Sequence, residues 1–257
     1  MDGAKSITVT LNDDASYPAT LVGSDARNDL AIIKIEATDL VPTVLGDSDM
    51  LTVGEDVIAI GNPLGELRGT ATGGIISAVK RSITVEGTDM QLIQTDAAIS
   101  PGNSGGGLFN ASGKLIGIVN AKVSDSNAEG LGFAIPVNSV VKEINDLLNF
   151  GYVTGRAYLG VYTQNVTLTN DFGFFSYGGT RCVQITDVVK GGPAEAAGLK
   201  AGDLILEIDG KTVSSNDVLS DLIASYNAGD SATLTIRRDG SRMEVRVTFA
   251  EYVPTEP

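Results

Sequence analysis

Hydrophobic and polar residues alternate over most of the first 140 residues, in short runs separated by Gly, Pro, Asn and Asp. A period of two is typical of half-buried β-strands, because successive side chains point to opposite faces of a sheet. The pattern predicts strands at residues 7–11, 20–24, 30–35, 56–60, 70–79, 91–95, 107–109, 115–121 and 132–135. Short strands joined by glycine-rich turns favour a barrel or a sandwich over alternating β-α units.

The period changes to that of a helix after residue 136. A Pro-Val-Asn-Ser stretch at 136–139 begins the predicted helix, and Asn-Phe-Gly at 149–151 ends it. Its apolar face consists of Val140, Val141, Ile144, Leu147 and Leu148. We expect a first domain over residues 1–150, followed by a linker at 151–155.

Residues 156–251 carry a second set of patterns, which predicts a smaller α+β domain. Helices are expected at 193–197 and 216–226, with strands at 203–208, 232–238 and 242–249. Asp239-Gly240 separates the last two runs, and Asp-Gly between alternating segments is a strong hairpin signal. The proline-flanked tail at 252–257 is expected to fray.

Composition narrows the possible partners. Of the 257 residues, 42% are hydrophobic and 19% are charged, which is sufficient for packed cores. The net charge of −14 argues against nucleic acid as the main partner, because phosphate binding requires a basic surface. No apolar run approaches the length of a bilayer span, so we expect no membrane contact within this chain.

Cysteine and histidine usage bears on metals and redox chemistry. Cys182 is the single cysteine and the chain has no histidine, which excludes an intrachain disulfide and disfavours structural zinc. We therefore expect no metal and no cofactor. Cys182 lies in an alternating stretch that predicts a buried, apolar role, and a reactive thiol is the alternative.

The most informative segment is Pro-Gly-Asn-Ser-Gly-Gly-Gly at 101–107. A serine nucleophile needs an exposed tight turn, backbone N–H groups beside it for the oxyanion, and a base within reach. The glycines around Ser104 permit the first two, although an ordinary turn is the alternative interpretation. The absence of histidine removes the usual base.

Several motifs resemble those of the HtrA (DegS/DegP-like) serine proteases, and they occur in the same order. They are Asn-Asp-Leu-Ala at 28–31, Leu-Gly-Asp-Ser at 45–48, Ala-Ile-Gly-Asn-Pro at 59–63, Gln-Thr-Asp-Ala-Ala-Ile at 94–99, the serine segment, Gly-Ile at 117–118 and Gly-Phe-Ala-Ile-Pro at 132–136. The resemblance implies a mainly β, trypsin-like double barrel. It also implies that Ser104 is the nucleophile and Asp29 the triad acid. A turn or capping carboxylate is the alternative for Asp29.

The same resemblance implies further site residues. The oxyanion hole would use the N–H groups of Gly102, Asn103 and Ser104. The pocket for the residue before the scissile bond would be lined by Ile99, Ala121 and Lys122. The first two imply a small apolar side chain in the substrate. Lys122 departs from the apolar residue usual in the family and is expected to point into solvent.

In this family the triad histidine precedes the stretch that matches residues 2–5. We therefore expect an incomplete first barrel and a chain that is essentially inactive as given. Truncation is the favoured account, and a natural pseudo-protease is the alternative.

The second domain resembles a bacterial PDZ domain. The resemblance rests on Tyr-Leu-Gly-Val at 158–161, Gly-Pro-Ala-Glu-Ala-Ala-Gly-Leu at 192–199, Gly-Asp-Leu-Ile at 202–205 and Ile-Asp-Gly at 208–210. PDZ domains bind peptide C-termini by adding a strand to a sheet edge. The carboxylate would be held by backbone amides of Tyr158, Leu159, Gly160 and Val161.

Parts of this second resemblance leave alternatives open. Leu159 and Val161 could be ordinary core residues. The helix at 216–226 would wall the peptide site, and the spacing does not decide which of its apolar residues face it: Val218, Leu219, Leu222 and Ile223. The aromatic stretch at 166–178 is interpreted as a loop packed on its own domain, with a contact surface as the alternative. Its aromatic residues are Phe172, Phe174, Phe175 and Tyr177.

Two functional hypotheses follow. The first is a PDZ-regulated serine endopeptidase of protein quality control, acting on unfolded or misfolded proteins through an acyl-enzyme on Ser104. The second is a non-catalytic peptide-binding protein. The family resemblance also implies an extracytoplasmic location, a membrane anchor in a missing N-terminal segment, and a homotrimer in the full-length protein.

Overall fold

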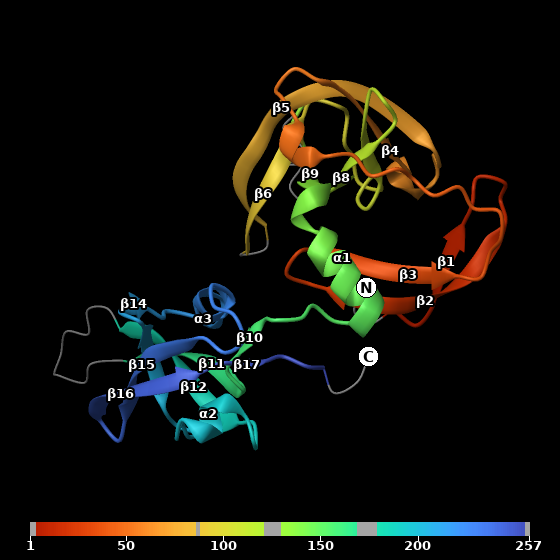
Figure 1. The fold of residues 1–257 in the computed structure, drawn as a ribbon. Helices are drawn as coiled ribbons and strands as arrows, with labels where there is room; N and C mark the ends of the chain where they lie inside the picture. The colour runs from red at the N-terminus through yellow and green to blue at the C-terminus, as the bar shows by residue number, and fades with distance from the viewer. Residues whose placement is uncertain (1–3, 86–87, 121–129, 169–178, 255–257) are drawn as a thin grey trace. The chain divides into compact units, whose positions relative to one another are not determined.

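The computed structural model describes residues 4–85, 88–120, 130–168 and 179–254. The chain divides into two compact units, residues 1–152 and 153–257. Both units are built mainly from β-strands, as the alternating pattern predicts (Figure 1). Residues 169–178, which hold all four aromatic residues of the stretch at 166–178, lie outside the described residues, as do Ala121 and Lys122.

Six antiparallel strands of the first unit form a closed barrel, in the order β4-β5-β6-β9-β8-β7 (Figure 1). Their bounds are β4 Asp56–Gly61, β5 Thr70–Val85, β6 Thr88–Thr95, β7 Gly107–Asn110, β8 Leu115–Val119 and β9 Gly132–Pro136. Inward-facing residues such as Ile76, Ile93 and Leu108 are fully buried in its core. The barrel therefore forms a closed scaffold for the loops at its strand ends.

Three further strands of this unit form a separate antiparallel sheet: β1 (Ile7–Thr10), β2 (Ser16–Asp25) and β3 (Leu30–Ile35). Helix α1 (Val141–Phe150) contacts β2 and β3. The approach is close, since a Cβ on Gly23 would lie 2.7 Å from the Gly151 carbonyl oxygen. The prediction of a mainly β class is confirmed. The part corresponding to the first barrel is an open three-stranded sheet within the described ranges.

The second unit contains a mixed-length antiparallel sheet in the order β11-β12-β13-β15-β16, with β14 paired to β13, and a small β10-β17 ladder. The strands are β10 Ala157–Tyr158, β11 Val161–Leu168, β12 Thr180–Val188, β13 Leu204–Ile208, β14 Lys211–Thr212, β15 Ser231–Arg238, β16 Ser241–Thr248 and β17 Ala250–Glu251. The helices are α2 Pro193–Ala196 and α3 Asn216–Ala224. The predicted hairpin is present, and both Asp239 and Gly240 have positive φ, as a two-residue turn of type I′ requires.

Cys182 lies on β12 and is fully buried. Burial raises the pKa of its thiol despite the opposing effect of Arg237. A reactive thiol needs a lowered pKa and solvent access. The interpretation as a buried apolar residue is therefore confirmed.

Candidate active site and peptide-binding loop

The serine loop begins with a β-turn over residues 100–103. Pro101 and Gly102 occupy its central positions, Gly102 has φ of 99°, and the Asn103 N–H donates to the Ser100 carbonyl at 3.0 Å. Proline followed by a residue of positive φ is the signature of a type II turn. Ser104 follows directly and is exposed, as a nucleophile must be.

This turn changes the predicted set of oxyanion donors. The N–H of Asn103 closes the turn, which takes it out of that set in this conformation. The N–H of Gly102 donates to no acceptor among the residues that the structure describes. Gly102 is exposed beside Ser104, so its N–H is available to an incoming carbonyl oxygen.

The loop after β4 supports the turn from behind. Asn62 N–H donates to the Gly102 carbonyl at 3.3 Å, and Leu64 N–H donates to the Pro101 carbonyl at 2.9 Å. A Cβ on Gly102 would lie only 2.3 Å from the Asn62 carbonyl oxygen. Glycine is therefore required at residue 102 for two reasons: its positive φ and this close packing.

The other end of the serine loop is tied to β8. Gly105 N–H donates to the Val119 carbonyl at 2.9 Å, and Val119 N–H donates to the Gly106 carbonyl at 2.8 Å. Asn120 follows Val119, is 1% exposed, and donates from Nδ2 to Oδ2 of Asp29 at 3.4 Å. The end of β8 thus connects the loop of Ser104 with the predicted acid.

Asp29 itself lies in the turn between β2 and β3, with φ of 53°. Its side chain is exposed, and its N–H donates to the Ala26 carbonyl at 3.4 Å. The sequence prediction included Asp29 and omitted Asn120. The available signal was a polar amide inside the apolar stretch predicted as a strand at 115–121, where a buried side chain needs a polar partner.

Ile99, the described member of the predicted specificity pocket, is partly buried against the barrel core. A Cβ on Gly132 would lie 2.6 Å from its Cγ1, so Ile99 packs against the start of β9. An apolar side chain close to the serine loop is consistent with selection of an apolar substrate residue. The assignment of the pocket remains a prediction.

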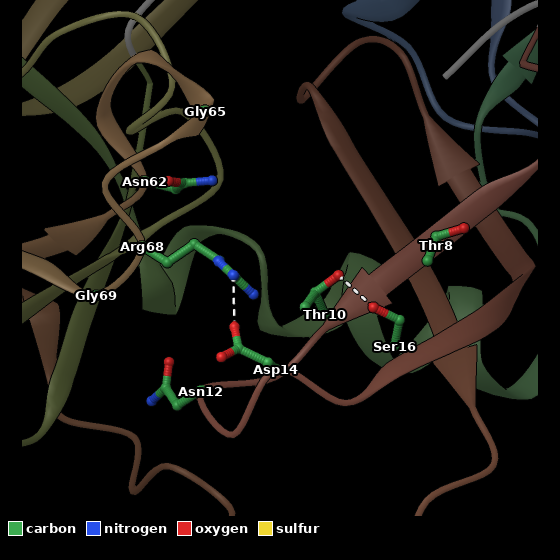
Figure 2. Close-up of a pocket in the computed structure, with 9 residues that line it drawn as sticks. All are labelled: Thr8, Thr10, Asn12, Asp14, Ser16, Asn62, Gly65, Arg68 and Gly69. Atoms are coloured by element: carbon green, nitrogen blue, oxygen red, sulfur yellow. Dashed lines mark hydrogen bonds and ion pairs between the residues drawn. The ribbon is translucent and has the colours of Figure 1, made fainter.

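A polar groove of about 720 Å³ lies between the β1–β2 hairpin and the loop after β4 (Figure 2). Arg68 reaches across it to Asp14 at 2.6 Å, and Thr10 and Ser16 share a hydrogen bond at 3.0 Å. Asn62, which lines this groove, also holds Gly102 through its backbone. One of the residues that support the serine loop, Asn62, therefore also lines this groove.

The predicted carboxylate-binding loop is held in place by hydrogen bonds that its carbonyl groups accept. Ala194 N–H donates to the Leu159 carbonyl at 3.0 Å, and Val189 N–H donates to the Gly160 carbonyl at 2.9 Å. In a trans peptide the C=O and the next N–H point in opposite directions. The N–H groups of Gly160 and Val161 therefore point away from these partners, as a site for a carboxylate requires.

Residues near this loop have separate roles. Leu159 is 3% exposed and belongs to the core, so its side chain is structural, whatever its backbone binds. Leu219 of α3 is likewise a core residue, whereas Leu222 and Ile223 are only partly buried against the core. Val218 is half-buried and, among the described residues, lies outside that cluster, so of these four apolar residues of α3 it is the one not packed on the core.

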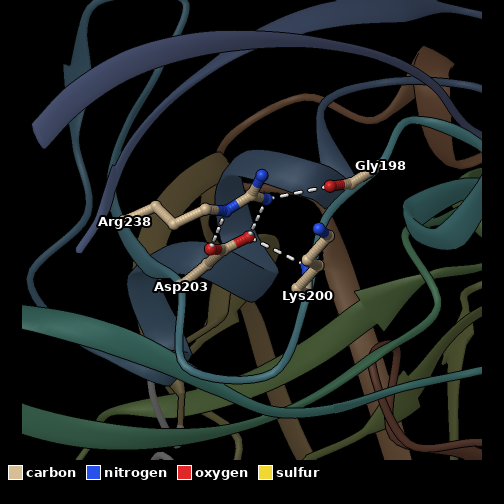
Figure 3. Close-up of polar contacts among 4 residues, drawn as sticks. All are labelled: Gly198, Lys200, Asp203 and Arg238. Carbon is tan, nitrogen blue, oxygen red and sulfur yellow. Dashed lines mark hydrogen bonds and ion pairs between the residues drawn. The ribbon is translucent and has the colours of Figure 1, made fainter.

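A buried ion pair fixes the turn that follows α2 (Figure 3). Arg238 Nε and Nη2 donate to the two carboxylate oxygens of Asp203 at 2.6 and 2.7 Å, and Arg238 also donates to the Gly198 carbonyl. Burial alone would raise the pKa of Asp203. The hydrogen bonds from Arg238 and from the Lys200 N–H outweigh burial and lower this pKa below its usual value.

The described ranges of the chain contain no cluster of three or more His, Cys, Asp or Glu side chains that could hold a metal ion. They also contain no helix with the length and apolar character needed to cross a membrane.

Comparison with known families agrees with the two-unit organisation. Residues 1–118 match the trypsin-like peptidase domain family, and residues 157–249 match the PDZ domain family. The chain is 42% identical over 264 residues to the serine protease Do-like HtrB of Bacillus subtilis. It is 42% identical over 255 residues to a probable periplasmic serine endoprotease DegP-like of Halomonas elongata. These alignments cover 98% of this chain and 57% and 52% of the two relatives.

Solved structures show the same relationship. The HtrA-type protease AlgW with a decapeptide is 35% identical, with a TM-score of 0.63, and the match covers 98% of this chain and 77% of that one. A serine endoprotease from Yersinia pestis is 33% identical, with a TM-score of 0.60 and coverage of 98% and 82%. Similarity of this extent in both sequence and fold supports common ancestry over both units.

Proposed function

This chain belongs to the HtrA family of trypsin-like serine proteases, and we propose that the protein it represents is a PDZ-regulated serine endopeptidase. The observation that carries the proposal is the type II turn over residues 100–103, which presents the Gly102 N–H beside the exposed Ser104. The named activities of the relatives support it.

In the proposed reaction the Ser104 Oγ attacks the carbonyl carbon of a peptide bond as its proton passes to a base. The carbonyl oxygen becomes an oxyanion, which the N–H groups of Gly102 and Ser104 stabilise. The C–N bond then breaks, the amine leaves with the proton, and the acyl group stays on Oγ. Water hydrolyses this ester in a second addition and elimination. Asp29 would orient and stabilise a histidine base.

The chain of 257 residues contains no histidine, so we propose that it hydrolyses peptides very slowly by itself. Removing the base from a comparable triad lowers kcat by roughly a millionfold, equivalent to about 8 kcal/mol of barrier. An intact oxyanion hole and binding would leave roughly a 10³-fold acceleration over water.

Unfolded or misfolded proteins with accessible C-termini are the proposed substrates and ligands. The PDZ match, the outward N–H groups of the 158–161 loop and peptide-bound relatives support peptide binding. An extracytoplasmic location is proposed because relatives are named periplasmic. A homotrimer of the full-length protein belongs to the same proposal and rests on the family resemblance.

The lack of histidine favours one second candidate, a peptide-binding protein on a protease scaffold without catalysis. It differs from the first in what Ser104 does, because it requires no activated serine. Peptide binding by the PDZ unit is common to both.

The discriminating experiment is labelling by a serine-directed fluorophosphonate, measured by intact mass with Ser104→Ala as control. We expect slow labelling near pH 7 that accelerates with pH, because hydroxide replaces the missing base, and none in Ser104→Ala. Absence of labelling at pH 9, with a known serine protease labelled in parallel, would reject a functional nucleophile in this chain and favour the second candidate.

A further inference from the structure

Strand β11 has an unpaired edge among the described strands, and the pairing on its other side fixes which backbone groups face that edge. Val161 is opposite Val188, and the bond from Val189 N–H to the Gly160 carbonyl flanks this pair. Such a flanking bond identifies a non-hydrogen-bonded pair, whose own N–H and C=O groups point away from each other. The backbone of Val161 therefore faces the free edge.

The register of β11 against β12 shifts between Tyr162 and Thr163, so the orientation of Thr163 is taken from its own partner. Thr163 is opposite Ile185, whose N–H and C=O are bonded to Asp203 and Gly202 on the far side of β12. Thr163 therefore also presents its backbone to the free edge. Asn165, two residues further, does so in turn. A ligand strand on this edge would meet Val161, Thr163 and Asn165 in that order.

Asn165 differs from the other two because its side chain is bonded to α3. Its Oδ1 accepts the N–H of Asn216, the first residue of that helix, at 2.7 Å. Its side chain lies on the same strand face as that of Val161, which packs on the core with α3 residues. The Asn165 side chain thus spans from the strand to the start of the helix.

We propose that Asn165 is the positioning residue that limits how many residues of a bound C-terminus pair with β11. The proposal rests on the peptide-binding function proposed above, and it adds the length of the recognised segment. The Val161 carbonyl accepts the N–H of the last ligand residue, and Thr163 pairs with the third residue from the end. The fifth residue from the end meets the Asn165–Asn216 link.

Helix α3 contacts β11, and the hydrogen bond crosses the space between them. A ligand strand that paired with β11 past Thr163 would enter this space and would require the hydrogen bond to break. The carboxylate loop and two ladder positions then provide the recognition. We therefore expect the last four residues of a ligand to determine its affinity, with residues further upstream contributing little.

The test uses the full chain and synthetic peptides. A library of eight-residue peptides with free carboxylates, randomised at the last three positions behind an Ala-Ser extension, first supplies a binder. Its extension is then shortened stepwise, and Kd is measured by fluorescence anisotropy. For the wild type, lengthening from four to eight residues should improve Kd by less than about 2-fold. For Asn165→Ala the improvement should be about 5-fold, the value of an added ladder hydrogen bond.

Two matched variants isolate the link. Asn165→Asp retains an oxygen that accepts the Asn216 N–H and should behave as the wild type. Gln164→Ala removes a neighbouring side chain that hydrogen-bonds to Gln184 on the adjacent strand at 2.9 Å and not to α3. This variant should also behave as the wild type. Amide exchange at Asn216, followed by NMR, should be slow in the wild type and Asn165→Asp and fast in Asn165→Ala. Asn165→Ser replaces Asn165→Ala if that variant does not fold.

The outcomes are separable. The role of Asn165 would be overturned if lengthening the peptide changed Kd equally for the wild type and for Asn165→Ala, whether Kd improved in both or in neither. A different result, in which no free-carboxylate peptide binds or carboxamide peptides bind equally well, would overturn the proposed peptide-binding function itself.

Discussion

The serine loop and the carboxylate-binding loop both use a glycine of positive φ to expose backbone N–H groups, but the two glycines are held differently. At Gly102, with φ of 99°, a Cβ would lie 2.3 Å from the Asn62 carbonyl oxygen. At Gly160, with φ of 76°, the nearest atom to a Cβ would be Pro193 Cδ at 3.2 Å. Hydrogen bonds to carbonyl groups hold both loops, but only the serine loop is also packed against another backbone segment at its glycine.

The comparison also separates binding from catalysis. The carboxylate loop needs only backbone groups that Val189 and Ala194 orient within the same unit. The serine loop provides oxyanion donors in the same way, yet acyl transfer also needs an acid and a base from other elements. Asp29 lies in the β2–β3 turn and is linked to the serine loop by its hydrogen bond with Asn120, and the chain contains no imidazole. A site made of backbone groups needs only its loop and the groups that orient it, whereas a catalytic site also needs side chains from other elements.

The largest effect is expected for Gly102→Ala. Backbone strain at this φ and overlap with the Asn62 carbonyl should together destabilise the first unit by about 4 kcal/mol. Fluorophosphonate labelling of Ser104 should disappear with it. Denaturant unfolding followed by circular dichroism measures the first effect, and intact mass measures the second.

Two alanine substitutions serve as controls for this change. Gly105 has φ of 82° and no atom within 4 Å of its Cβ position, so Gly105→Ala should cost only about 1 kcal/mol of backbone strain. Gly160→Ala should also cost about 1 kcal/mol, because its closest neighbour is the edge of a proline ring. Equal losses of unfolding free energy in Gly102→Ala and Gly160→Ala would contradict the proposed difference in packing between the two loops.

The next largest effect concerns the polar support of the second unit. Arg238→Met leaves the carboxylate of Asp203, which is 1% exposed, without its charged partner, and should cost about 3 kcal/mol. Arg242→Met on the same hairpin is the matched control. Its ion pair with Glu207 is largely exposed, so its loss should cost under about 1 kcal/mol. Similar losses of stability in the two variants would refute a structural role for the buried pair.

The same pair has a pH dependence of defined sign. The folded state lowers the pKa of Asp203, so its contribution to stability is complete above the unfolded pKa of about 4. The contribution is lost as the pH falls through the folded-state pKa. Unfolding free energies measured across the acid range should therefore fall more steeply for the wild type than for Arg238→Met.

Sequence patterns predicted the elements that are locally encoded. The barrel strands, the helix ending at Gly151 and the Asp239-Gly240 hairpin follow from alternation, helical spacing and turn chemistry. The pattern did not predict β11, because its alternation of partly buried and exposed residues is interrupted at Gln164 and Asn165, which are both exposed.

Long-range contacts explain what was missed in the candidate site. Ser104 and its turn could be inferred from neighbouring glycines and proline. The link from Asn120 to Asp29 joins residues 91 positions apart, and that between Asn165 and Asn216 joins residues 51 apart. The hydrogen bond from the Asn103 N–H to Ser100 could not be predicted from the sequence either, because a glycine-rich segment permits several types of turn. Local chemistry predicts a loop, but folding decides which of its groups remain available.

The smallest expected effect lies at the turn after β13, where a tyrosine anchors the residues that follow α3. The Tyr226 hydroxyl donates to Asp209 Oδ2 at 2.7 Å, and this bond raises the pKa of Tyr226 to about 12. Tyr226→Phe keeps the ring contact with Phe249 and should cost about 1 kcal/mol. Because the folded-state pKa is raised, the contribution is complete below the unfolded pKa of about 10 and is lost as the pH approaches 12.

Ultraviolet difference spectroscopy across the alkaline range measures this ionisation. The wild type should show a tyrosine that ionises near pH 12, and Tyr226→Phe should lack it. Persistence of that ionisation in the variant would assign it to another tyrosine and remove the evidence for this polar anchor. Its loss, together with a lower free energy of unfolding and unchanged peptide binding, would show that this hydrogen bond stabilises the second unit without affecting the carboxylate loop. The serine loop should differ in this respect, because its packing against Asn62 holds the turn that presents the Gly102 N–H.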